Sequence, residues 1–360
     1  MDREALFRNA LSKWMDGTGP GAELALSSRV RLARNVEGIP FSHMMNEEQA
    51  QRVLGLAQSG VDELNRFGFL GRVDFIPMAE LQPLERQVLV EKHLISPQQA
   101  EEPLHKAVAI SEDESTSILV NEEDHFRVQC LTSGLQLEQA WQTASRVDDA
   151  LESRVTFAFS ERRGYLTACP TNVGTGVRVS VMMHLPALVI TNQAGRVFHS
   201  ATQLGLAVRG LYGEGTEAIG NIFQVSNQIT LGRGEEEIVG HLKAVSAQII
   251  EQERQARSAL LAEARERLED RICRSYGVLQ NARIINSEEA MRLLSDVRLG
   301  SDVGIIKNVS LKTLNELLVL TQPGFLQRRA GLALGPGDRD LRRAAVIRQR
   351  LAGGTTAREK

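Results

Sequence analysis

In the stretch Asn121-Glu122-Glu123-Asp124-His125-Phe126-Arg127, the first five residues lie between two short runs rich in β-formers, Ser117–Val120 and Phe126–Leu131. β-rich runs on both sides of an acidic turn predict two strands of one sheet. A further apolar–polar alternation at Ile222–Leu231 predicts a half-buried strand, and Thr156–Ser160 with Tyr165–Ala168 predicts a hairpin. The first part of the chain is therefore expected to be α+β, with strands paired largely antiparallel.

Helical patterns surround and follow these strands. They are expected at 4–15, 47–67, Leu137–Leu151, Glu235 to about Arg274, 287–296 and 310–321. From Glu235 onward the chain is rich in Ala, Leu, Glu, Gln and Arg, which favours helix. We place a domain boundary at 255, with a catalytic α+β domain at 1–255 and an all-helical domain at 256–360.

Bulk composition excludes several classes of protein. The chain has 360 residues, is 42% hydrophobic and 24% charged, and carries a net charge of -3, as expected for a soluble protein with no general attraction to nucleic acid or membrane. Its three cysteines form no CxxC pair, so a reducing cytoplasm fits best. No signal peptide, membrane span or fixed metal site is expected.

Five arginines occur in four motifs, each of which is weak on its own. Guanidinium groups are permanently charged forks that match phosphate oxygens, and nearby glutamates suit a cationic acceptor. The combination indicates phosphoryl transfer, yet the chain has no P-loop and no protein-kinase motif set. The motifs are Ser27-Ser28-Arg29-Val30-Arg31, Asn121 to Arg127, Cys169-Pro170-Thr171-Asn172-Val173-Gly174-Thr175-Gly176-Val177-Arg178, and Arg209-Gly210-Leu211-Tyr212-Gly213-Glu214.

In this order the four motifs resemble the catalytic domain of the phosphagen (guanidino) kinases, from about residue 24 to about residue 253. The resemblance implies an antiparallel, glutamine-synthetase-like sheet flanked by helices, and ATP brought with Mg²⁺. It assigns to ATP the residues Ser27, Ser28, Arg29, Val30, Arg31, His93, Arg127, Arg178, Val179, Ser180, Val181, Met182, Arg209, Gly210, Leu211, Tyr212 and Gly213.

A guanidinium is a poor nucleophile because its lone pairs are delocalised and it stays protonated. A carboxylate can orient it and accept a proton. The resemblance selects Glu123 as principal base and Glu214 as a second clamp on a glycine-rich loop. It also places a reactive cysteine at Cys169, where nearby cations would favour the thiolate; we expect a tuning role there, and none for Cys130 or Cys273.

The C-terminal part suggests which guanidino substrate is used. Only 26 residues precede Ser27, so the helical domain that metabolite-specific phosphagen kinases place first is expected to be absent. From Gly324 to Lys360 there are nine Lys and Arg against three Asp and Glu. Within it, Arg339 and Arg343 lie at i, i+4, and Asp340 is adjacent, which could hold a phosphate together with a guanidinium. A charged solvent-facing helix or a nucleic-acid patch would also fit the spacing.

Over essentially the full chain the sequence is similar to the bacterial protein arginine kinases, whose helical domain carries an Arg-Asp-x-x-Arg-Ala motif. That similarity implies phosphorylation of arginine in proteins as a mark for Clp-protease degradation, a homodimer, a zinc-binding activator protein, and a stress-gene repressor among the targets. It also implies allosteric phosphoarginine binding at Arg339, Asp340, Leu341, Arg342, Arg343 and Ala344. The competing hypotheses are a kinase of free arginine and a phosphoarginine-binding adaptor whose catalysis is incidental.

Overall fold

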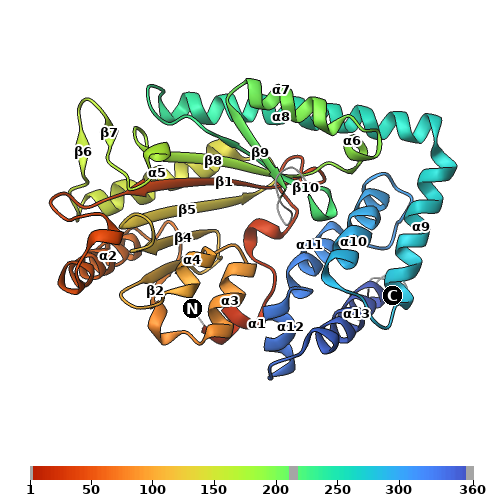
Figure 1. Cartoon of the computed structure of the whole chain (residues 1–360), viewed down its shortest axis with the longest axis horizontal. Helices are drawn as coiled ribbons and strands as arrows, with labels where there is room; N and C mark the ends of the chain where they lie inside the picture. Colours follow the sequence, from red (N-terminus) through yellow and green to blue (C-terminus); the bar gives the residue numbers. More distant parts are fainter. Residues whose placement is uncertain (1–2, 211–217, 354–360) are drawn as a thin grey trace.

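An eight-stranded sheet forms the centre of the computed structural model, which describes residues 3–210 and 218–353 (Figure 1). Its strand order is β2-β3-β4-β5-β1-β8-β10-β9, and every neighbouring pair is antiparallel, which confirms the predicted antiparallel sheet. The strands are β1 Ala25–Arg34, β2 Val73–Pro77, β3 Ala107–Ser111, β4 Thr116–Val120, β5 Phe126–Ser133, β8 Val177–His184, β9 Leu206–Gly210 and β10 Ile222–Asn227.

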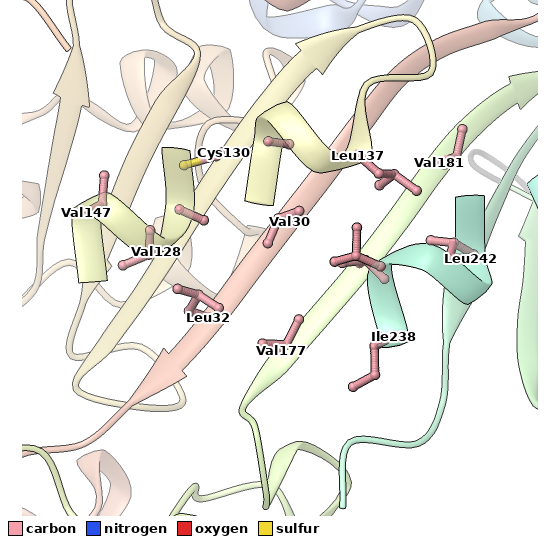
Figure 2. Packing of buried hydrophobic residues seen from close by; sticks show 14 of the residues in the cluster. Val30, Leu32, Val128, Cys130, Leu137, Val147, Val177, Val181, Ile238 and Leu242 are labelled. Carbon is pink, nitrogen blue, oxygen red and sulfur yellow. The ribbon is translucent and has the colours of Figure 1, made fainter. Parts of the chain in front are cut away.

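Strict alternation gives the central strands two chemically different faces. Val30 and Leu32 of β1 are fully buried, whereas Arg29 and Arg31 project to the other side of the sheet. Figure 2 shows Val30 and Leu32 packed among apolar side chains of the neighbouring strands, with helices α5 (Leu137–Glu152) and α8 (Glu235–Glu263) over them. The apolar face is thus closed by helices, and its reverse carries the arginines.

Helix α2 (Glu47–Phe67) packs on the same apolar face, and its ends follow the sequence prediction. Asn46 accepts from the backbone N–H of Gln49, and the Gln49 side chain accepts from the N–H of Asn46, forming a capping box. Gly68 ends the helix in the left-handed conformation, at φ 67°. The predicted helix 47–67 is confirmed.

The predicted single helix from Glu235 to about Arg274 is wrong. Ala264 has φ −140°, outside helical geometry, and separates α8 from α9 (Arg265–Asn281). Neither Gly nor Pro causes the break; α8 packs on the sheet while α9 packs on later helices, so tertiary contacts override local propensity (Figure 1). The expected boundary at 255 falls within α8. The later helices are α10 Ser287–Asp302, α11 Leu311–Leu320, α12 Pro323–Ala330 and α13 Pro336–Gly353.

A second hydrophobic cluster joins the two ends of the chain. Leu6, Phe7 and Trp14 of the N-terminal segment are buried in it together with Leu317 and Phe325 of the C-terminal helices. One core is therefore shared by the N-terminal segment, by side chains of strands β2, β3 and β4, and by the C-terminal helices. The remaining helices around it are α1 Arg3–Arg8, α3 Pro83–Glu91 and α4 Pro97–Glu101, while α6 Pro186–Ile190 and α7 Ala194–Gln203 lie beside the first core.

The expected helix at 4–15 is shorter than predicted. Helix α1 ends at Arg8, and a single 3-10 turn at Lys13–Met15 follows. The buried ammonium of Lys92 donates to the carbonyl oxygens of Leu6 (3.0 Å) and Asn9 (2.9 Å). In a longer helix these carbonyls would accept hydrogen bonds from backbone N–H groups one turn later. Because Lys92 occupies them instead, helix α1 ends at Arg8.

The predicted strand at Ile222–Leu231 is also shorter, since β10 ends at Asn227. The Asn227 side chain bonds the backbone of β8 at Val179 and Val177, which occupies groups a continuing strand would use. The expected hairpin forms as β6 (Phe159–Ser160) and β7 (Gly164–Tyr165), reduced to two residues a strand. In the part of the chain that the structure describes, no helix combines the length and apolar character required for a membrane span.

Candidate active site

Five arginines from four strands gather on the polar face of the sheet. Arg31 on β1 is the register partner of Arg178 on β8, and Arg29 is the partner of Ser180. Arg127 alternates with the buried Phe126 and Val128 on β5, which places it on that same face. Arg209 on β9 pairs with Gln224 of β10. The alternation thus brings all five predicted arginines together, although the first and the last, Arg29 and Arg209, are 180 residues apart in sequence.

These arginines repel one another. Burial and the charges of Arg127 and Arg178 lower the pKa of Arg29 to about 10. Burial, reinforced by the charges of Arg29, Arg127 and Arg178, also lowers the pKa of Arg31 well below its usual value. The Nε atoms of Arg31, Arg127 and Arg178 are buried and have no hydrogen-bond partner in the described residues. Clustered cations with unsatisfied donors fit a polyanion such as a triphosphate, which would supply both charge and acceptors.

A pocket of about 410 Å³ opens at this face, between the sheet and the segment that joins α3 to α4. His93 lines it in a left-handed conformation, at φ 59°, and its carbonyl accepts from Gln129 at 2.7 Å. Burial, aided by Arg29, lowers the pKa of His93 to about 4, so its ring is neutral at pH 7. Trp14 meets the ring edge-on, with centroids 5.8 Å apart. The predicted nucleotide residue His93 therefore lies beside the arginines.

Of the three carboxylates in the acidic turn, Glu122 and Asp124 are held by bonds within the fold. Glu122 pairs with Arg127 at 2.5 Å and accepts from the Ser96 hydroxyl. Asp124 accepts from the Asn35 side-chain amide and from the backbone N–H of Ala168, both at 2.7 Å. Both groups are buried, so the turn is not a solvated loop.

Glu123 is the carboxylate of this turn that faces the predicted cysteine. Burial, together with the charges of Asp124 and Glu122, raises its pKa, while Arg127 and a hydrogen bond from Cys169 act in the opposite direction. A carboxylate with a raised pKa beside a cationic cluster is a candidate proton acceptor. The guanidinium of Arg178 interacts electrostatically with Cys169 and Glu123, and also with Arg209.

The loop from Cys169 to Arg178 is held in place by its own polar groups and by the arginine that ends β1. The Cys169 thiol lies 3.0 Å from the Thr171 hydroxyl. Arg34 donates to the carbonyl of Thr175 and pairs with the buried Asp148, at 3.0 and 2.6 Å. Gly176 has φ 66°, and a Cβ there would lie 2.6 Å from Arg34 Nη1, which explains its glycine.

Other predicted site residues are placed less directly. The side chains of Val30, Val179 and Val181 lie in the apolar cluster on the opposite face, so they can offer a ligand backbone groups alone. Ser28 is also turned away and bonds the carbonyl of Gly134. Leu211, Tyr212, Gly213 and Glu214 lie outside the described residues; Gly210 ends β9 just before them.

The C-terminal motif lies in helix α13, where its two arginines differ in environment. Arg343 is 2% exposed, and its guanidinium donates to the carbonyls of Thr321 (2.9 Å) and Ile285 (3.0 Å) and to Asp340 at 2.5 Å. Arg339 is partly exposed, and its side chain has no ion pair within residues 3–210 and 218–353. Leu341 and Arg342 are exposed and Ala344 is buried.

Several residues in the pocket, or in contact with its arginines, were not predicted from the sequence. Gln129 and Gln224 hold His93 and Arg29 respectively, the latter at 2.7 Å. They could have been recognised, since each alternates with buried apolar residues, Gln129 on the strand of Arg127 and Gln224 on the predicted strand that begins at Ile222. Glu91 and Gln322 also line the pocket, but they come from outside any motif and meet through the tertiary fold.

The fold and this arginine face define a phosphotransferase of the phosphagen-kinase class. Residues 56–256 match the family model "ATP:guanido phosphotransferase, C-terminal catalytic domain", and residues 265–360 match "Protein-arginine kinase McsB C-terminal domain". The chain belongs to the ATP:guanido phosphotransferase family, and within it to the protein-arginine kinases, which confirms the resemblance carried by its motifs.

Relatives support this membership over almost the full length. The chain is 60% identical to the protein-arginine kinase of Symbiobacterium thermophilum over 96% of this chain and 98% of that protein. It is 54% identical to the protein-arginine kinase of Bacillus subtilis over 98% of this chain and 96% of that protein. Solved structures show the same fold: the duplicated taurocyamine kinase from Schistosoma mansoni aligns with a TM-score of 0.59 at 24% identity, covering 69% of this chain and 35% of that one. Lombricine kinase aligns with a TM-score of 0.58 at 22% identity, covering 71% and 73%.

Proposed function

We propose that this chain transfers the γ-phosphoryl group of ATP to the guanidinium of arginine side chains in proteins. The observation that carries the proposal is the cluster of Arg29, Arg31, Arg127 and Arg178 next to Glu123, a carboxylate with a raised pKa. In the last three of these arginines the buried Nε donor has no partner among the described residues. Membership among the protein-arginine kinases supports the choice of acceptor.

In the proposed reaction a guanidinium nitrogen of the substrate attacks the γ-phosphorus. The N–P bond forms as the bond from phosphorus to the ADP oxygen breaks, and the proton lost by the nitrogen passes to Glu123. The arginines offset the charge on the phosphate oxygens throughout, which is most of what phosphoryl transfer requires. Cys169 donates a hydrogen bond to Glu123 and thereby lowers the pKa of that carboxylate. Glu214 is proposed as the second carboxylate, which holds the acceptor.

A divalent cation, proposed to be Mg²⁺, would arrive with ATP and neutralise phosphate charge. Among residues 3–210 and 218–353, no three His, Cys, Asp or Glu side chains are grouped to hold a metal ion. The proposed nucleotide contacts are those assigned above to ATP, with the buried valines contributing backbone only.

Further proposals rest on the family resemblance. They are a cytoplasmic homodimer, a catalytic domain at 1–255 and a helical domain at 256–360, phosphoarginine binding at Arg339–Ala344, a zinc-binding activator, a stress-gene repressor among the substrates, and delivery of products to a Clp protease.

The test is incubation of the full chain with MgATP and an arginine-rich protein, followed by mass spectrometry at neutral pH, because the N–P bond is acid-labile. Phosphate on arginine is expected, and it should be lost on acid treatment. Phosphate on serine alone, or none, would overturn the proposal. Free arginine in a parallel assay separates a small-molecule kinase, which would phosphorylate it more efficiently than the protein.

A further inference from the structure

A second, larger pocket lies away from the arginine face. It has a volume of about 850 Å³ and lies where the N-terminal segment meets the C-terminal helices. Its walls are the segment Arg8 to Leu11, the α11 residues Lys312, Glu316 and Leu320, Arg329 at the end of α12, and Arg350 on α13. No residue of the four phosphotransferase motifs or of the Arg339–Ala344 motif lines it.

The pocket is strongly basic within an acidic protein. Four cations and one carboxylate line it, a formal balance of +3, whereas the whole chain carries -3. Arg350 is paired with Glu316 at 2.8 Å. Arg8, Lys312 and Arg329 are exposed and have no ion-pair partner within the described ranges. Three of the four cations are thus available to a ligand.

Buried anchors fix the walls of the pocket. Lys92 donates to the carbonyls of Leu6 and Asn9 and pairs with Glu114 at 2.6 Å, which holds the N-terminal wall. Glu91 accepts from the backbone N–H groups of Gly324 (2.6 Å) and Phe325 (3.0 Å), which holds the first turn of α12. A pocket whose walls are held in this way loses little entropy when it binds.

The lining indicates what kind of anion would bind. No Phe, Tyr or Trp lines the pocket, so it offers no surface on which a nucleobase could stack. The cations come from four separate elements, and buried Ala10 and Leu320 form apolar wall between them. The volume exceeds that needed for one phosphate and lies in the upper part of the range for ligand pockets. The ion pair between Glu316 and Arg350 shows that a carboxylate can bind to a cation that lines this pocket.

We propose that this pocket binds an acidic segment of polypeptide, which presents several carboxylates to Arg8, Lys312 and Arg329. The binding is independent of the phosphoryl transfer proposed above, and it requires no ATP. Helix α12 has Arg329 in its last turn and Gln322, a residue of the nucleotide pocket, as its N-cap, so the two pockets share a wall element.

The experiment measures fluorescence anisotropy of a labelled hexaglutamate peptide with the full-length chain, without nucleotide. Saturable binding that weakens as salt is added is expected. Lys312→Glu and Arg329→Glu should each weaken it roughly tenfold, because each replaces an attraction by a repulsion. Arg196, an exposed residue of α7 outside the pocket, provides the matched control, and Arg196→Glu should change affinity less than about twofold.

A charge swap completes the test. The triple variant Arg8→Glu, Lys312→Glu, Arg329→Glu should bind a hexalysine peptide that the unchanged chain does not bind, which shows that the variant is folded and that the charges lie in one site. No saturable binding of hexaglutamate, or an equal loss in Arg196→Glu, would overturn the proposal. Tripolyphosphate binding at least tenfold more tightly than hexaglutamate would overturn the assignment to polypeptide.

Discussion

Arg31 on β1 and Arg178 on β8 are direct register partners in the antiparallel sheet, so two guanidinium groups project side by side from one face. Like charges opposite each other destabilise a sheet. The lowered pKa of both groups has burial as its first cause, and the charges of neighbouring arginines add to it. The ligand-free fold therefore carries an electrostatic cost that an anion would offset.

Replacing Arg31 by Met should stabilise the protein without nucleotide and destroy nucleotide binding. Removing a buried, repelled cation is expected to raise the free energy of unfolding by about 1 kcal/mol. Loss of a phosphate ligand should cut kcat/KM by about 10² to 10³. Thermal unfolding with and without ATP measures stability and nucleotide binding, and a coupled assay of ADP release measures kcat/KM. The control is Arg196→Met on exposed α7, which should change neither; a lower melting temperature for Arg31→Met would contradict the repulsion argument.

Glu123→Gln should lower kcat by about 10² to 10⁴ while leaving ATP affinity within about twofold, since the amide cannot accept the proton. A base works when deprotonated, so activity should rise with pH through the pKa of Glu123, which is above its usual value. A coupled assay of ADP release across pH gives this profile. Loss of ATP binding in the variant would mean that Glu123 holds the nucleotide instead.

Cys169→Ala should move that rise in activity to higher pH. The hydrogen bond from Cys169 lowers the pKa of Glu123, so its removal raises the pKa and leaves less base at a given pH. Cys273, an exposed cysteine on α9, provides the matched control, and Cys273→Ala should leave the profile unchanged. An unshifted profile in Cys169→Ala would show that the thiol does not tune Glu123.

Glu91 makes stability depend on pH. Burial raises its pKa to about 7, although two backbone N–H groups of α12 act against the rise. The folded state holds this proton more tightly than the unfolded chain, so its contribution is complete below the unfolded pKa of about 4.5 and is lost as pH rises through 7. Comparison of the denaturation midpoints of Glu91→Gln and the unchanged chain at pH 5 and 8 should show a smaller fall with pH in the variant. An equal fall would remove Glu91 as the cause.

How far the sequence predicted this molecule depends on whether local pattern or tertiary contact decides each element. The alternation around Arg29, Arg31 and Arg178 was visible in the sequence, because a strand side chain faces one side or the other. The end of α1 was not, because it depends on Lys92, which lies more than 80 residues away. The break at Ala264 has no local signal at all. Glu91 and Gln322 join the pocket beside the arginines through packing of α3 on α12, and nothing in either segment indicates that contact.

Tertiary contacts also decide the roles of the two arginines in the Arg-Asp-x-x-Arg-Ala motif. The sequence spacing does not show that Arg343 is buried and Arg339 partly exposed. Arg343→Ala should destabilise the fold by about 3 kcal/mol, because it leaves Asp340 unpaired and two buried carbonyls without donors. Arg339→Ala should change stability by less than about 0.5 kcal/mol, since its side chain makes no ion pair among the described residues.

If the proposed phosphoarginine site is present, Arg339→Ala should nevertheless weaken binding of a phosphoarginine peptide about tenfold. Urea denaturation and calorimetric titration measure the two quantities, with the exposed Arg196→Ala, outside every proposed site, as control. Unchanged peptide binding in a folded Arg339→Ala variant would remove that arginine from the site, and unchanged stability in Arg343→Ala would show that its buried bonds are not needed by the fold.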